Sequence, residues 1–130
     1  MTQKDGSTSG WNQGPNWLDR PQVYTNSKIE WTVAESNLLF TNYPRRLLLT
    51  GSTSNDTWRS CRATVRLFLD GRLFWTDTTT LHRKAAVDWK LSVGLAENIG
   101  GHLEVKVALS KAHPRMRWVI RSIRLDTPGR

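Results

Sequence analysis

The sequence has one cysteine, no long apolar run and few hydrophobic side chains for its 130 residues. A single cysteine excludes an internal disulfide framework and a zinc site built from cysteines. No apolar stretch approaches the ~18 residues of a membrane span, and the polar start does not resemble a secretory signal, so we expect a soluble protein. Hydrophobic residues make up 38% of the chain, which at this length supports one domain with its own core.

The sequence also lacks the short motifs of common enzyme classes. There is no G-x-S-x-G nucleophile turn, no G-x-x-x-x-G-K-[ST] phosphate loop and no H-E-x-x-H helix. The histidines His82, His102 and His113 are isolated from one another, and Cys61 begins an apolar stretch in which a small buried side chain is expected. We therefore predict no enzymatic activity, no metal site and no cofactor.

No segment carries the 3.6-residue periodicity of an amphipathic helix over three turns. Two shorter apolar runs, 38–40 and 47–49, are typical of buried strands between turn signals. Apolar and polar residues alternate with period two elsewhere, in residues 28–33, 62–69, 87–95 and 102–109. Such alternation indicates antiparallel strands with one buried and one solvated face. The sequence predicts an all-β fold, an antiparallel β-sandwich or jelly roll with an extended N-terminal arm.

Asp70-Gly71 is expected to form a two-residue hairpin turn, because both central positions of this turn need positive φ. In the unbroken register that follows from this turn, Arg66 faces Trp75 on the neighbouring strand. Both side chains would then lie on the outer face of the sheet, with the guanidinium over the indole.

The last apolar run changes phase along its length. Trp118 and Ile120 share one parity, whereas Ile123 and Leu125 share the other. One extra residue near Arg121 would return all of them to the same face of the sheet, so we place a β-bulge there.

Residues 1–27 differ in composition from the rest of the chain. They are rich in glycine, serine, threonine, asparagine, glutamine and proline and show no apolar periodicity. We therefore separate an N-terminal arm, 1–27, from a β-sandwich domain, 28–130. Trp11 and Trp17 lie in this polar arm. Since burying an indole removes about 150–250 Å² from water, we expect both to anchor the arm on the domain or on a neighbouring subunit.

Arginine outnumbers lysine by 13 to 6, and residues 1–44 contribute none of the net charge of +8. Arginine favours forked hydrogen bonds to carboxylates and phosphates, and together with tryptophan it is enriched at protein interfaces. Because the sequence has no recognition helix and no base-stacking motif, nucleic-acid binding is expected to be weak and non-specific at most. We assign partner binding to Trp11, Trp17, Arg62, Arg66, Trp75, Arg117, Arg121 and Arg124.

The arm segment GWNQGPNWLDRPQVY and the arginine-rich ending RMRWVIRSIRLDTPGR, on a compact basic sandwich, resemble the small virion proteins of tailed phages. These are capsid decoration proteins and small tail or adaptor components. The resemblance implies a non-catalytic structural protein of the virion, made in the host cytoplasm. It also implies a homo-oligomer that contacts other virion subunits and no membrane. The alternative is a carbohydrate-binding β-sandwich module that stacks sugars on exposed tryptophans.

Overall fold

A computed structural model describes residues 10–24, 30–55, 60–81, 85–110 and 116–129 of the chain. Within these residues the strands are β1 (Trp11–Asn12), β2 (Gln22–Tyr24), β3 (Glu30–Leu38), β4 (Arg45–Asn55), β5 (Cys61–Leu69), β6 (Arg72–Leu81), β7 (Ala85–Leu95), β8 (Gly101–Ser110) and β9 (Met116–Pro128). The described part of the chain contains no helix that is long and apolar enough to cross a membrane.

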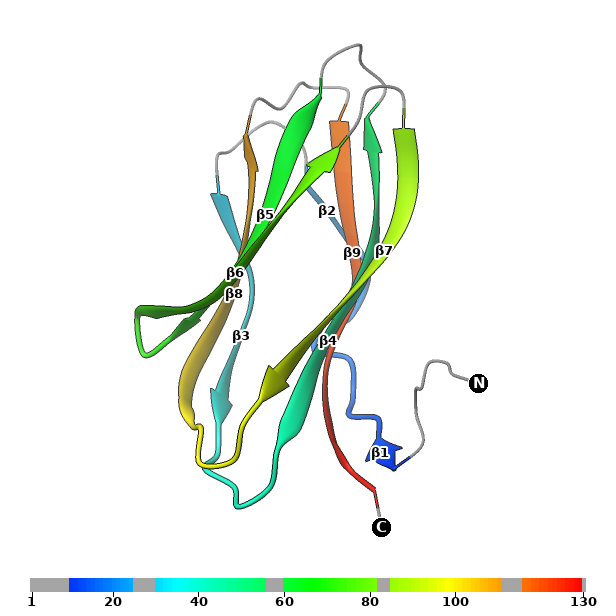
Figure 1. The fold of residues 1–130 in the computed structure, drawn as a ribbon. Coiled ribbons are helices and arrows are strands. Elements are labelled where there is room, and N and C mark those ends of the chain that lie inside the picture. Colours follow the sequence, from blue (N-terminus) through cyan, green and yellow to red (C-terminus); the bar gives the residue numbers. More distant parts are fainter. Residues whose placement is uncertain (1–9, 25–29, 56–59, 82–84, 111–115, 130) are drawn as a thin grey trace.

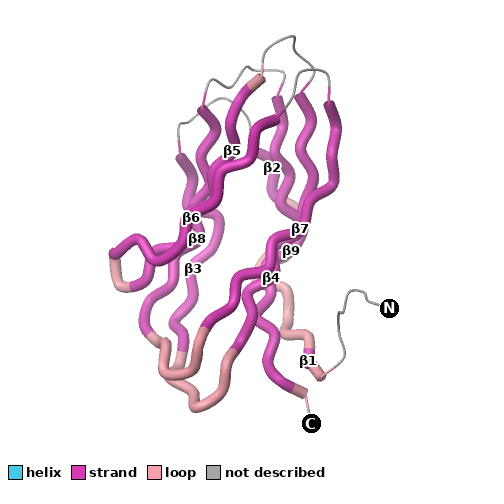
Figure 2. The backbone as a smooth tube through the Cα atoms, viewed as in Figure 1, coloured by secondary structure: helices cyan, strands magenta, loops and turns pink. Residues whose placement is uncertain are grey.

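The strands form two antiparallel sheets that face each other (Figure 1), and the same two layers are clear in the backbone tube of Figure 2. One sheet has the order β1-β9-β4-β7, with β2 also paired to β9, and the other has the order β3-β8-β5-β6. The pairs β2–β9, β3–β8, β4–β7 and β5–β6 are nested, like one long hairpin rolled up on itself. This nesting is the jelly-roll arrangement, so the predicted all-β sandwich is confirmed.

The core lies between the two sheets. The predicted alternation places one set of side chains in this layer along β5 and β8 and along β7 from Trp89 onward, whereas Val87 of β7 is 52% exposed. Hydrophobic burial in this layer stabilises the fold. Its fully buried members come from both sheets and include Leu47, Leu49, Leu67, Leu95, Leu103, Val105, Ile120 and Ile123. The predicted buried strand at residues 47–49 is confirmed as part of β4, where all three leucines are buried.

The expected bulge at Arg121 is confirmed. Thr50 of β4 pairs with Ser122 and the next residue, Gly51, pairs with Ile120, so Arg121 is the extra residue on β9. A bulge leaves backbone groups without ladder partners. The Asn16 side chain supplies them, because its Nδ2 donates to the Arg121 carbonyl at 3.1 Å and its Oδ1 accepts from the Ile123 N–H at 2.9 Å.

Replacing Asn16 by alanine is expected to lower the free energy of unfolding by about 1.5–3 kcal/mol. The substitution removes the two bonds at the bulge and a third, in which the Leu18 N–H donates to the same Oδ1 at 3.1 Å. Asn16→Asp keeps the acceptor for both N–H groups but turns a carboxylate oxygen toward the Arg121 carbonyl, so we expect it to restore only part of the stability. Equilibrium unfolding in urea measures both variants, and an Asn16→Ala protein as stable as the parent would contradict this role.

The Asp70-Gly71 turn has the expected positive φ at both residues, 51° and 81°. The register beyond the turn differs from the prediction, because Phe74 is an extra residue on β6 and Leu67 pairs with Trp75. The predicted pairing of Arg66 with Trp75 is therefore wrong. The extra residue turns Trp75 toward the core, against which it packs half-buried, and so removes apolar surface from water.

The described part of the arm runs along the edge of β9. The short strand β1 pairs with Thr127 and Pro128, and β2 pairs with residues 118–120. Between these strands, Leu18 is only 8% exposed and belongs to the core, and Trp17 packs against it. The predicted boundary between arm and domain, after residue 27, lies outside the described residues.

Candidate functional site

The two most exposed large apolar side chains of the described residues lie in the connection between β3 and β4. Leu39 is 78% exposed and its neighbour Phe40 is 72% exposed, and Tyr43 follows them in the same connection. We call Leu39, Phe40 and Tyr43 the end surface. A buried strand at residues 38–40 was expected and is wrong beyond its first residue, because β3 ends at Leu38 and the chain turns there.

Hydrogen bonds hold the backbone around the end surface. The Asn98 N–H donates to the Thr41 carbonyl at 2.8 Å, and the Thr41 hydroxyl donates to the Tyr43 carbonyl at 2.8 Å. The Phe40 ring lies against Gly100, where an added Cβ would be 2.5 Å from Cδ1 of the ring. The exposed side chains are therefore presented on a backbone that is already ordered, which lowers the entropy lost on binding a partner.

Two further features border this end of the molecule. An open hollow beside Tyr43 is lined by Asn12, Asn42, Tyr43, Thr127 and Pro128. The turn of the β5–β6 hairpin is held to the start of β8, because the Asp70 N–H donates to the His102 carbonyl at 2.8 Å and the Asp70 carboxylate accepts from the His102 N–H at 2.9 Å. Leu73 and Phe74, just after that turn, are exposed.

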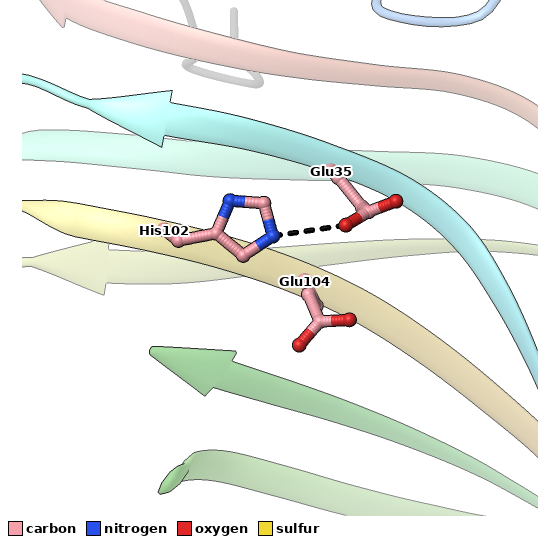
Figure 3. Close-up of side chains that lie close together, drawn as sticks. All are labelled: Glu35, His102 and Glu104. Atoms are coloured by element: carbon pink, nitrogen blue, oxygen red, sulfur yellow. Dashed lines mark hydrogen bonds and ion pairs between the residues drawn. The ribbon is translucent and has the colours of Figure 1, made fainter. Parts of the chain in front are cut away.

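Glu35, His102 and Glu104 gather on β3 and β8 (Figure 3). Glu35 and Glu104 are directly opposite each other in the ladder, and His102 Nε2 donates to Glu35 Oε1 at 2.9 Å. The second ring nitrogen, Nδ1, lies 3.1 Å from Asn37 Oδ1. The two contacts hold the imidazole ring between β3 and β8, next to the Glu35 and Glu104 carboxylates.

These three side chains are the ones among the described residues that could hold a metal ion. Each offers one ligand atom, the atoms lie within 4.8 Å of one another, and imidazole with carboxylate oxygens suits Zn²⁺ or Mn²⁺. The group is partly open to solvent, and a cation bound there would compete with the hydrogen bond between His102 and Glu35. The expectation of no metal stays a prediction. Sequence reasoning missed this group because its members lie on two strands, with Glu35 and His102 67 residues apart in the sequence.

A cavity of about 180 Å³ lies between the two sheets and is lined by side chains of five strands. Trp89 of β7 and Trp118 of β9 form one wall, with their ring centroids 5.9 Å apart and their planes at 72°. Trp89 lies over Gly51 of β4, where an added Cβ would be 2.7 Å from the indole and 2.1 Å from the Val119 carbonyl oxygen. A glycine at residue 51 is thus required for the indole to take this position.

The arginines assigned to partner binding lie on opposite faces of the sandwich. Arg117 and Arg124 point away from the core on β9, because their neighbours Trp118 and Ile123 are buried. The bulge residue Arg121 is exposed near them, and its guanidinium lies 3.5 Å from Asp88.

Arg62 and Arg66 lie on β5, on the outer face of the other sheet. Arg66 forms an ion pair with Glu30, with 3.0 Å between Nη1 and Oε2. The five arginines therefore do not form one basic surface, and their role in partner binding stays a prediction.

The tryptophans assigned to partner binding are all half-buried. Trp11 lies under the Arg46 guanidinium, 4.7 Å from the ring centroid, whereas Trp17 and Trp75 pack against the core. Every tryptophan in the described part of the chain is buried or half-buried. Trp58 lies outside those residues.

Neither a protein-family model nor a curated protein matches the chain. Solved structures with the same fold come from virus particles. A structure of infectious bursal disease virus, Gx strain, is 9% identical with a TM-score of 0.58, and the match covers 92% of this chain and 33% of that chain. The VP2 subviral particle of the same virus is 12% identical with a TM-score of 0.53, and the match covers 92% of this chain and 32% of that chain.

A sugar-binding protein, the EclA C-terminal domain, is 17% identical, with 96% of each chain covered and a TM-score of 0.49. The present chain spans about a third of the length of the viral chains that it matches. At these identities the likeness is one of fold. The likeness of fold is to proteins of these virus particles in general and not specifically to those of tailed phages.

Proposed function

We propose that the chain is a non-catalytic structural subunit of a virion, of the capsid decoration or tail/adaptor kind found in phages. The observation that carries this proposal is the end surface, where two adjacent large apolar side chains are 78% and 72% exposed on an ordered backbone. Exposed apolar groups of this kind mark protein–protein interaction sites, and aromatic side chains dominate the binding energy of such interfaces. The fold that the chain shares with virus-particle structures supports the same role.

The partner of the end surface is another virion subunit, in the first place a second copy of this chain. Leu39 and Phe40 give an apolar centre, and the polar hollow beside Tyr43 gives a rim, which is the usual anatomy of an interface.

Sedimentation velocity tests this role on the full chain. We expect a defined oligomer for the parent protein and a shift to monomer for the double variant Leu39→Glu, Phe40→Glu, because carboxylates would be buried without partners. Val23→Glu is the matched control, since Val23 is 57% exposed on β2, away from the β3–β4 connection, and should leave the oligomer intact. A monomeric parent, or a double variant that sediments like the parent, would overturn the proposal.

Carbohydrate binding is the competing function. It was predicted from exposed tryptophans, and each tryptophan in the described residues is buried or half-buried, so those residues offer no open indole platform for a sugar. A glycan array probed with the isolated monomer separates the two functions. Saturable binding to a defined glycan by a protein that does not oligomerise would favour the module over the structural subunit.

A further inference from the structure

The cavity between the sheets is independent of the end surface and has the features of a binding site. The polar side chains among its lining residues are Thr53, Asn55, Asp77, Thr79 and Thr80, and the apolar ones are Ala63, Val65, Val87, Trp89, Leu91 and Trp118. Its lining includes residues of β6 and β7, which are the edge strands of the two sheets. A ligand can therefore reach it between two strands that are not paired with each other.

The size of the cavity fits one six-membered ring. A cavity of about 150 Å³ with apolar walls stays dry and binds benzene in another protein. The cavity here is slightly larger, about 180 Å³, and the surface it presents is mostly apolar. Its mostly apolar walls offer little to solvate a molecule that is polar all round.

The two indoles in the cavity wall each have an N–H donor that lacks a hydrogen-bond acceptor among the described residues. Trp118 is only 3% exposed, and its Nε1–H has no hydrogen-bond partner among the described residues. The Nε1–H of Trp89, the other indole of the same wall, is buried and also lacks a partner there. A buried donor without an acceptor is unfavourable, so an indole that turns slightly toward the cavity to meet a ligand oxygen would satisfy its donor.

The charge of the lining excludes one class of ligand. Asp77 is the one charged side chain among the described lining residues, and it pairs in register with Val65, which places it on the inner side of the edge strand β6. A carboxylate at this position repels anions and can accept a hydrogen bond from a ligand hydroxyl.

We propose that this cavity binds a small uncharged ring compound, alicyclic or aromatic, that carries one hydroxyl or carbonyl oxygen. The ring fills the apolar volume beside Ala63 and Val65, and the oxygen accepts a hydrogen bond from the Trp118 or Trp89 indole. A monosaccharide has a ring of the same size but is disfavoured, because most of its hydroxyls would lose water against apolar walls.

Nuclear magnetic resonance of the full ¹⁵N-labelled chain tests this site with cyclohexanone, cyclohexanol and methyl glucoside as probes. The indole Nε1–H signals are assigned with Trp89→Phe and Trp118→Phe variants. We expect cyclohexanone and cyclohexanol to shift the Trp89 and Trp118 signals saturably, with a Kd of about 1 mM, and to leave the Trp31 signal unchanged. Absence of a saturable shift, or tighter binding of methyl glucoside than of cyclohexanol, would overturn the proposal.

Two substitutions locate the binding. Ala63→Leu fills the cavity, so cyclohexanone affinity should fall at least tenfold while the melting temperature is kept or raised. Thr64→Leu is the control, because it puts the same side chain on the outer face of β5, and it should bind cyclohexanone like the parent. Trp118→Phe keeps a ring in the wall but removes one donor, and should weaken cyclohexanone binding several-fold. If Ala63→Leu does not fold, Val65→Ile takes its place. Unchanged affinity in the filled variant would place the binding elsewhere and refute the assignment.

Discussion

Gly51→Ala is expected to lower the free energy of unfolding by about 3 kcal/mol, the largest effect we expect from any single methyl group in this chain. The added Cβ would lie 2.1 Å from the Val119 carbonyl oxygen and 2.7 Å from Cζ2 of Trp89. The carbonyl belongs to β9, which is paired with β4 on both sides of the bulge, so it has little freedom to move away. The indole is restrained in turn by its edge-to-face contact with Trp118.

The matched control for this substitution is Gly94→Ala. Gly94 is also a glycine within a paired strand, β7, and a Cβ added there meets nothing within 4 Å. We expect a change within about 0.5 kcal/mol, because the new methyl group is exposed and unstrained. Urea unfolding monitored by tryptophan fluorescence measures both variants. Equal losses in the two proteins would show that the close approach at residue 51 is not a constraint.

Leu18→Ala is expected to lower the free energy of unfolding by about 2–4 kcal/mol. Leu18 lies between β1 and β2 in the arm, yet it is 8% exposed and belongs to the same core as the inner faces of both sheets. Its truncation removes buried methyl groups and leaves a cavity that the paired strands around it cannot close.

Leu39→Ala is the control, because it makes the same chemical change at a leucine that is 78% exposed. Its stability should stay within about 0.5 kcal/mol of the parent, while its self-association weakens. Thermal unfolding and sedimentation together separate the two outcomes. A Leu18→Ala protein no less stable than Leu39→Ala would contradict the role of Leu18 in the core.

The sequence predicted those parts of the fold in which the apolar pattern has a clear phase. Along β9 the parity changes between Ile120 and Ile123, and only an extra residue near Arg121 reconciles the two halves, which is what the register shows. In β6, by contrast, Leu73, Phe74 and Trp75 are consecutive apolar residues, so alternation does not say which of them faces inward. The bulge at Phe74 is decided by packing of Trp75 against the core, which no local pattern reveals.

The candidate sites were harder to predict, because each depends on contacts between distant parts of the chain. The apolar run Leu38-Leu39-Phe40 could either continue a buried strand or turn into solvent, and the sequence does not distinguish the two. In the structure β3 ends at Leu38, so the next two residues are exposed. His102 and Glu35 are far apart in sequence, and only the pairing of β3 with β8 brings them together in space. The cavity likewise needs five strands in place before its walls exist.

The nested strand pairs fix the order in which the chain can close. Among the nested pairs only β5 and β6 are joined by a short turn. Each pair outside them closes a longer loop, up to Trp11 and Pro128 near the two ends of the described residues. Loop-closure entropy and high contact order make such folding slow, and they favour zipping outward from the hairpin. During synthesis β1 and β2 leave the ribosome before β9 exists, so they stay without their partner while the six strands β3–β8 are made. Until β1 and β2 pair with β9 of their own chain, they can pair with β9 of a neighbouring chain instead. At high subunit concentration the closing step is therefore a competition between folding and strand exchange.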